Sequence, residues 1–198
     1  ADALAIRQQK ELEICVGGLK ALGHADENGL TAKGIWAAEL CTSLVLDLAE
    51  AIDEGLFFDL QLEELAGLVA SLSGDSYRQY LKIRKNPIKK EYFESLDELV
   101  KRVRALYHGN LTHEGEVLID ASSTVITWLE SETWAEFSGL LRLSGAAEGD
   151  VARLITQTAD HLNQISRLRE SHPELAKLAQ EAREKLLKPP IVETIVEN

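Results

Sequence analysis

Apolar residues recur at helical spacing along almost the whole chain, and this periodicity constrains the fold more than any other feature. The clearest case lies between Asp150 and Arg169, where positions i, i+3, i+4, i+7, i+11, i+14 and i+17 are Val151, Leu154, Ile155, Thr158, Leu162, Ile165 and Leu168. At about 3.6 residues per turn, these positions form one continuous stripe. The chain therefore contains at least one long amphipathic helix that packs against a core.

The same spacing predicts further helices over about residues 4–23, 35–52, 60–74, 95–106, 120–130, 133–144 and 171–188. Expected N-caps are Asp59, Ser95, Thr133 and Ser171, and expected helix ends are Gly23, Gly55, Gly74 and Gly145. The β-branched run at residues 124–127 leaves a strand as the alternative for residues 120–130. We expect an all-α fold, a single domain over residues 1–198 built as a bundle of about seven or eight helices.

Residues 74–93 interrupt this pattern and concentrate positive charge, so we interpret them as a basic loop within the domain. The whole chain has 21 Lys+Arg and 33 Asp+Glu and a net charge of −12. Residues 74–110 instead carry 9 basic and 5 acidic residues, a net charge of +4. The acidic total argues against strong nucleic-acid binding by the chain alone. The loop still offers possible phosphate contacts at Lys82, Arg84, Lys85, Lys89 and Lys90.

The reactive residues show no recognisable catalytic or metal-binding arrangement. The five histidines lack metal-ligand spacing, and the P-loop, GxGxxG, HExxH and GxSxG motifs are absent. Cys15 and Cys41 fall on or near apolar helix faces, so we expect both in the core. The sequence therefore predicts a chain that is not itself an enzyme and has no metal or cofactor of its own.

No apolar run approaches the roughly 20 residues that span a bilayer, and no signal peptide opens the chain. We therefore expect a cytoplasmic location and no membrane partner.

The face of the 150–169 helix opposite the apolar stripe carries mainly uncharged hydrogen-bonding side chains. Its members are Arg153, Thr156, Gln157, Asp160, Asn163, Gln164 and Arg167. Amide, hydroxyl and guanidinium groups bind sugars, bases and phosphates, so this face suits a nucleic acid. A polar face packed against another domain is the alternative interpretation.

Five segments follow one another along the chain, beginning with Gly29–Leu40 (GLTAKGIWAAEL) and Leu46–Phe57 (LDLAEAIDEGLF). In this order they resemble the DSHCT domain, the helical C-terminal domain of superkiller-type RNA helicases. The first resembles the family's LTxKGxxAxxI opening, and the second resembles its LLLTELLFNGxF segment. Asp59–Ser73 and Val125–Phe137 are similar to later family segments, and Glu148–Leu154 (EGDVARL) resembles EGDLVRLxRR. The resemblance covers about residues 12–192.

The resemblance implies an accessory domain of an ATP-dependent RNA helicase, in which separate motor domains hold ATP and Mg²⁺. The family's long ratchet helix, which touches RNA leaving the motor, corresponds to Asp150–Arg169. The residues predicted to bind RNA lie on the polar face of this helix and are Arg153, Thr156, Gln157, Asp160 and Gln164. Of these, the resemblance matches Gln157 and Asp160 to the family's RNA-contacting Arg and acidic residue. Gln157 stands where the family usually has Arg, whereas Asp160 keeps the acidic character.

The implied partners are single-stranded RNA, bound weakly by the chain alone, and the helicase motor domains. The alternative function is a docking module for a protein or an adjacent domain. Such a module would use apolar surface on the N-terminal helices and would not contact RNA.

Overall fold

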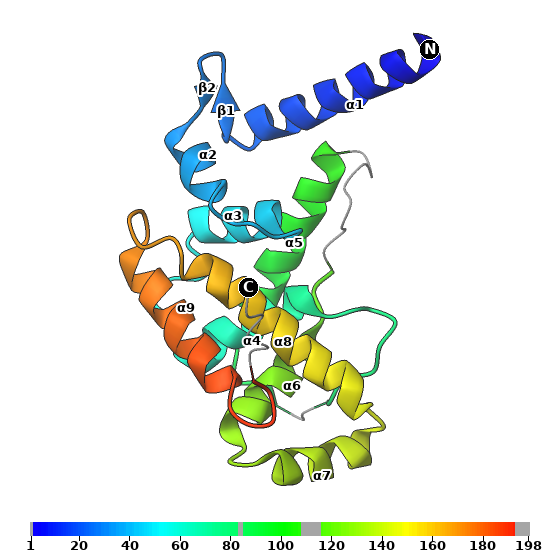
Figure 1. The fold of residues 1–198 in the computed structure, drawn as a ribbon, viewed down its shortest axis with the longest axis vertical. Helices are drawn as coiled ribbons and strands as arrows, with labels where there is room; N and C mark the ends of the chain where they lie inside the picture. Colours follow the sequence, from blue (N-terminus) through cyan, green and yellow to red (C-terminus); the bar gives the residue numbers. More distant parts are fainter. Residues whose placement is uncertain (1, 83–84, 108–115, 193–198) are drawn as a thin grey trace, which may run out of the picture.

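Nine helices and one short hairpin make up the described part of the chain, residues 2–82, 85–107 and 116–192 of the computed structural model (Figure 1). Their order is α1 (Asp2–Ala21), β1 (Ala25–Asp26), β2 (Gly29–Leu30), α2 (Ala32–Ala37), α3 (Val45–Asp53), α4 (Leu62–Ser73), α5 (Lys90–Leu106), α6 (Ile119–Glu130), α7 (Trp134–Ser144), α8 (Glu148–Ile165) and α9 (Pro173–Leu186). The two strands pair antiparallel across the turn at Glu27 and Asn28. The all-α prediction is confirmed.

Helix α4 is the centre of the core, and α6, α8 and α9 all pack against it. Every residue from Leu65 to Ser73 is buried, as expected for a helix that is covered on all sides. Gly67 permits the close approach of α6. A Cβ at this position would lie 2.8 Å from Ile126 Cδ1, Ile88 Cδ1 and Ser122 Oγ.

Hydrogen bonds join α6 to the end of α9 and to the segment that follows it. The indole of Trp128 is fully buried, and its Nε1 donates a hydrogen bond of 2.9 Å to Leu186 O. The Lys188 ammonium donates to the carbonyl oxygens of Trp128, at 2.8 Å, and Ser131. The Lys188 bonds add a charged donor to carbonyl groups at the C-terminal end of α6, where carbonyls lack part of the intrahelical bonding. They also hold α9 beside α6.

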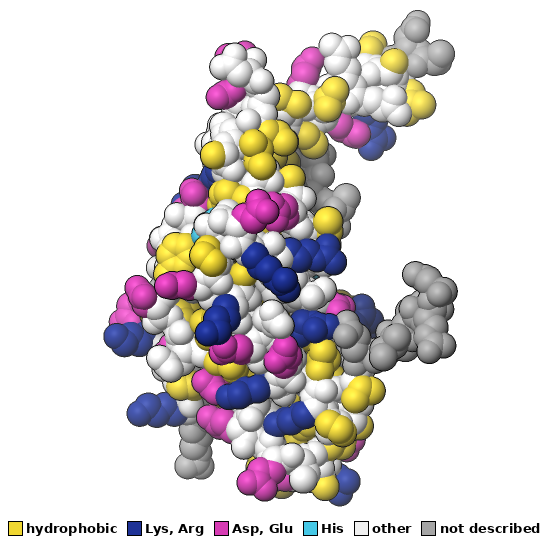
Figure 2. Space-filling model, turned by 60° about the vertical axis from the view of Figure 1, so that its left-hand side comes forward, with side chains coloured by type: hydrophobic (Ala, Val, Ile, Leu, Met, Phe, Trp, Pro, Cys, Tyr) yellow, Lys and Arg dark blue, Asp and Glu magenta, His cyan; other side chains and the backbone are white. Residues whose placement is uncertain are grey.

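Helix α1 projects from the rest of the molecule, and its N-terminal half lies beyond the bundle (Figure 1). It contacts α5 near its C-terminal end, where Gly18 lies close to the Tyr107 ring. Leu4, Ile6 and Leu12 are 63%, 67% and 63% exposed. Figure 2 shows hydrophobic side chains along this helix. Helix α1 therefore leaves apolar surface uncovered.

The helix expected over residues 35–52 is in fact two helices, and this break accounts for the ninth helix. Helix α2 ends at Ala37 and α3 begins at Val45. Between them, the Thr42 hydroxyl accepts a hydrogen bond of 3.2 Å from Leu44 N. Gln164 Oε1 accepts a hydrogen bond of 3.2 Å from Cys41 N. Cys41 is exposed and Cys15 is half-buried, so the expectation that both cysteines lie in the core was wrong.

Two predicted N-caps near the middle of the chain were also wrong. Asp59 has a left-handed φ of 55°, and Gln61 caps α4 in a reciprocal arrangement with Glu64. Ser95 lies inside α5, which begins at Lys90, so the basic loop ends earlier than residue 93. Aspartate tolerates the left-handed region better than most residues, which lets Asp59 form the turn before the cap.

The predictions for the C-terminal half were closer to the structure. Thr133 caps α7 by accepting from Glu136 N at 3.2 Å, and Gly145 ends the helix with a φ of 74°. The strand alternative for residues 120–130 was wrong, because α6 is helical throughout. His172, not Ser171, is the N-cap of α9, with Pro173 in the first turn. Helix α8 ends at Ile165, so Arg167 lies beyond it.

Candidate nucleic-acid interface

The apolar stripe of α8 is completely buried, as its spacing predicted. All seven stripe residues, six in α8 and Leu168 just after it, have an exposed fraction of 0%. The one polar member, Thr158, donates its hydroxyl to Leu154 O at 2.8 Å, so its burial leaves no unpaired group. Because this stripe lies on α4 and α9, the opposite face of α8 is fixed toward the surface.

The predicted RNA-binding residues occupy this outer face at helical spacing, so the structure brings all five to one side of α8. Arg153, Thr156 and Asp160 are exposed, whereas Gln157 and Gln164 are half-buried. The Thr156 hydroxyl donates to Ala152 O at 3.0 Å. The Gln164 side chain accepts from Cys41 N, as described above, so it also holds the residue 38–44 segment against α8.

A small pocket of about 240 Å³ opens at the middle of this face. Arg153, Gln157 and Asp160 line one side, and Ser73 and Asp75 line the other. Guanidinium, amide, hydroxyl and carboxylate groups therefore surround one space too small for a typical drug-sized ligand. The donor and acceptor set suits a sugar hydroxyl or a base edge of one nucleotide.

The far wall of the pocket is held by a side-chain hydrogen bond between α4 and α8. Ser73 Oγ lies 2.8 Å from His161 Nδ1 and also donates to Val69 O at 2.8 Å. Sequence reasoning did not find Ser73 or Asp75. No local spacing relates them to α8, and only the packing of the end of α4 against α8 places them there.

The start of the basic loop lies beside the start of α8. Arg78 Nη1 is 2.5 Å from Asp150 Oδ1, and Arg78 Nε is 3.9 Å from Asp75 Oδ2. Asp150 and Glu148 lie in the first turn of α8, where negative charge is favourable. The positive charge of Arg78 is therefore balanced within the protein.

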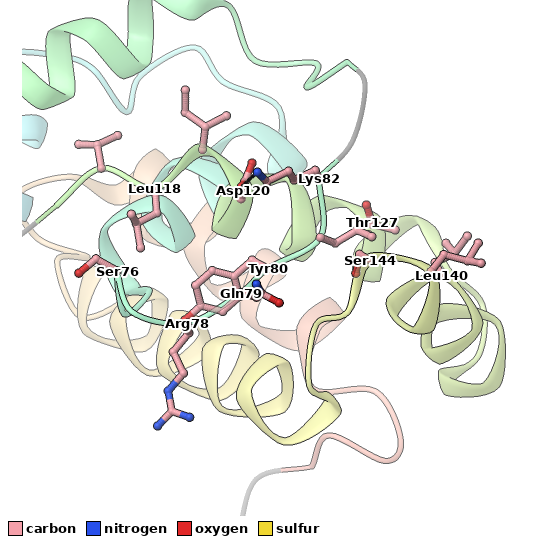
Figure 3. A pocket seen from close by; sticks show the side chains of 14 residues that line it. Ser76, Arg78, Gln79, Tyr80, Lys82, Leu118, Asp120, Thr127, Leu140 and Ser144 are labelled. Atoms are coloured by element: carbon pink, nitrogen blue, oxygen red, sulfur yellow. Dashed lines mark ion pairs between the residues drawn. The ribbon is translucent and has the colours of Figure 1, made fainter.

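The structure does not bring the predicted phosphate-binding lysines to the α8 pocket. Lys82 Nζ lies 3.9 Å from Asp120 Oδ2 at the edge of a wider groove of about 1150 Å³ into which Tyr80 projects (Figure 3). Lys90 pairs with Glu94 at 2.6 Å, and Lys85 and Lys89 are exposed. Arg84 lies outside the described residues. These lysines therefore lie near α5 and α6 and away from the α8 pocket.

The charge around α8 is mixed. Figure 2 shows Lys and Arg side chains interleaved with Asp and Glu over the visible face, without one large basic area. Along α8 itself, Arg153 and Asp160 are both exposed and opposite in charge. A strand that touches this face therefore meets hydrogen-bonding groups and little net charge, which suits movement along it better than tight fixation.

A family model described as the DSHCT (NUC185) domain matches residues 27–194. The match begins at the β1–β2 turn and includes every helix from α2 to α9, whereas α1 precedes it. A comparison with curated proteins found no match.

Proposed function

Because the chain belongs to the DSHCT domain family, whose members are accessory helical domains of helicase-associated proteins and not catalytic motors, we propose that it guides single-stranded RNA leaving a helicase motor. The RNA lies along the outer face of α8. The motor that supplies the RNA carries ATP and Mg²⁺ and packs on this domain. The observation that carries this proposal is the combination of a fully buried apolar stripe and an outward row of hydrogen-bonding residues on one helix.

The geometry supports individual roles for the residues of this face. The Arg153 guanidinium contacts a phosphate, while the Gln157 amide, at the α8 pocket, bonds a base edge or a ribose hydroxyl. Asp160 accepts from a ribose hydroxyl or an exocyclic amine. Thr156 adds one further hydroxyl oxygen beside them.

The direct test is a double variant, Arg153→Ala with Gln157→Ala, in the helicase that carries this domain. We expect slower RNA unwinding, while the ATPase rate measured without RNA stays near that of the unchanged protein. The matched control is Lys177→Ala with Gln180→Ala, which removes one positive charge and one amide from an exposed face of α9. Equal unwinding by the α8 variant and the unchanged protein would overturn the proposal.

A second candidate function, docking of an adjacent domain or a protein partner, rests on α1. Its exposed leucine and isoleucine side chains are the apolar surface that a docking module requires. A Leu4→Gln, Leu12→Gln variant tests this function, because it removes apolar surface without touching α8. Weaker association with the neighbouring domain, together with unchanged RNA crosslinking, is the result that supports docking.

A further inference from the structure

A further pocket lies between residues 57–60, which precede α4, and residues 172–178 at the start of α9. We call it the Phe58–His172 pocket, and its volume is about 640 Å³, within the range of small-ligand sites. Its lining residues lie among the described part of the chain, and none of them lines the α8 pocket. It is therefore independent of the proposed RNA path.

The floor of the Phe58–His172 pocket is aromatic and apolar. The Phe58 and His172 rings are nearly parallel, with centroids 6.1 Å apart and an interplanar angle of 24°. The His172 ring also meets Trp36 edge-on at 4.7 Å. Phe58 is 41% exposed, so one side of its ring is available to a ligand. Leu178 continues the apolar wall along α9.

The rim of this pocket is acidic. Asp59 and Glu174 line it, and neither makes an ion pair with another described residue. No lysine or arginine is among the described residues that line it. Burial lowers the pKa of His172 despite the opposing charge of Asp53, so the imidazole is neutral at neutral pH. The pocket thus combines exposed aromatic surface with two negative charges.

Aromatic surface beside two carboxylates disfavours one kind of ligand and favours another. The two carboxylates repel a phosphate backbone, and residues 1–73 as a whole carry 4 basic and 13 acidic residues, a net charge of −9. A guanidinium group, in contrast, stacks on an aromatic ring and donates to carboxylates from its planar edge. The apolar wall beside the ring suits aliphatic side chains that flank such a group.

We propose that the Phe58–His172 pocket binds a peptide segment of a partner protein through an arginine side chain flanked by apolar residues. The guanidinium stacks on the exposed side of Phe58 and bonds to Asp59 and Glu174. The flanking side chains lie against Leu178 and the neighbouring leucines of the wall. A protein partner can therefore be held on this side of the domain while RNA occupies α8.

The probe is a short capped peptide in which one arginine is flanked by leucines, titrated into the isotope-labelled chain and followed by NMR. The comparison peptide carries citrulline, a neutral analogue of nearly the same shape, in place of arginine. We expect shift changes at the side chains of Phe58 and His172, and binding about five-fold weaker for the citrulline peptide.

Two substitutions remove the negative charges of the pocket and nearly keep the shapes of the side chains. Asp59→Asn keeps a residue that tolerates the left-handed backbone, with a φ of 55° here, and removes only the charge. Together with Glu174→Gln it is expected to weaken the arginine peptide about five-fold and to leave the citrulline peptide unchanged. Glu132→Gln, in the exposed turn between α6 and α7, is the matched control and leaves both peptides unchanged.

Four results would overturn the proposal, and the first three concern the peptides alone. They are equal binding of the two peptides, shift changes that map away from this pocket, and no binding of either peptide at millimolar concentration. Displacement of the arginine peptide by oligouridine would also overturn it, because the site would then belong to the RNA path. Loss of RNA guidance in the α8 variant leaves this inference intact, since the two sites share no residue.

Discussion

Lys33 and Glu50 form a nearly buried ion pair, with 2.6 Å between Lys33 Nζ and Glu50 Oε1. Glu50 Oε1 also lies 3.0 Å from His24 Nε2, and Lys33 Nζ reaches Asp53 Oδ2 at 3.1 Å and Leu22 O at 2.6 Å. Lys33 comes from the LTAKG segment that pointed to the family. This network gives the segment a structural role, because it holds the β1–β2 hairpin and α2 on α3.

Replacing Glu50 by Gln should lower the free energy of unfolding by about 2–3 kcal/mol, because the buried charge that bonds Lys33 and His24 is lost while Lys33 keeps its contact with Asp53. Urea unfolding measures this change. Glu54→Gln is the control, because Glu54 pairs with Arg102 at the surface and its loss should cost less than about 1 kcal/mol. Equal losses of unfolding free energy in the two variants would contradict the idea that burial makes the Lys33–Glu50 pair more important for stability than the surface pair.

The Glu50 variant should also change the dependence of stability on acid. Burial raises the pKa of Glu50, but hydrogen bonds and charge from His24 and Lys33 outweigh it, so the net pKa is lowered from 4.5. Its stabilising contribution is therefore complete above the ordinary pKa and is lost as the pH falls through the lowered one. In acid, the free energy of unfolding of the Glu50→Gln protein should therefore decline without the part that comes from protonation of Glu50.

Asp47→Asn should stabilise the protein at neutral pH. Burial raises the pKa of Asp47 from 3.8 to about 6, and the positive charge of Arg104 only partly opposes it. A raised carboxyl pKa means that stability decreases as the pH rises from about 4 to about 6. The variant should gain up to about 3 kcal/mol in unfolding free energy at neutral pH, and the gain should vanish in acid. Urea unfolding at both pH values tests this, and a loss of stability at neutral pH would refute it.

Gly67→Ala and Gly139→Ala should change stability in opposite directions although both glycines are helical. A Cβ at Gly67 would lie 2.8 Å from side-chain atoms of Ile88, Ile126 and Ser122, so these side chains or the packing of α4 on α6 must shift. We expect a loss of about 1–3 kcal/mol. At Gly139 nothing lies within 4 Å, so the higher helix propensity of Ala should add about 0.5–1 kcal/mol. Thermal unfolding followed by circular dichroism distinguishes the two.

Gln157→Arg should strengthen RNA binding, because it adds a positive charge at the α8 pocket. One extra phosphate contact should steepen the slope of log affinity against log salt by about 0.7 for a single strand. Fluorescence anisotropy of labelled oligouridine over a salt series measures the slope. Gln180→Arg places the same charge on α9 and serves as the control. A slope that steepens equally in both variants would mean that RNA does not follow α8.

Much of the helical fold could be predicted from local sequence, because helix period and capping act within a few residues. The buried stripe of α8, the Thr133 cap and the Gly145 end are examples. The break between α2 and α3 could not be predicted in this way. Gln164, 123 residues away, helps to stabilise the connecting segment by accepting a hydrogen bond from Cys41 N. Asp59 was mistaken for a cap because Gln61, two residues later, competes for that place.

Local sequence was enough to predict that the chain is helical, which face of α8 is buried, and which of its residues point outward. Those properties depend on side-chain order along one helix. Tertiary structure alone decided that Ser73 and Asp75 complete the α8 pocket, and that Phe58 meets His172 at the start of α9. Such sites join residues distant in sequence, and their positions depend on how α3, α4, α8 and α9 pack around a shared core.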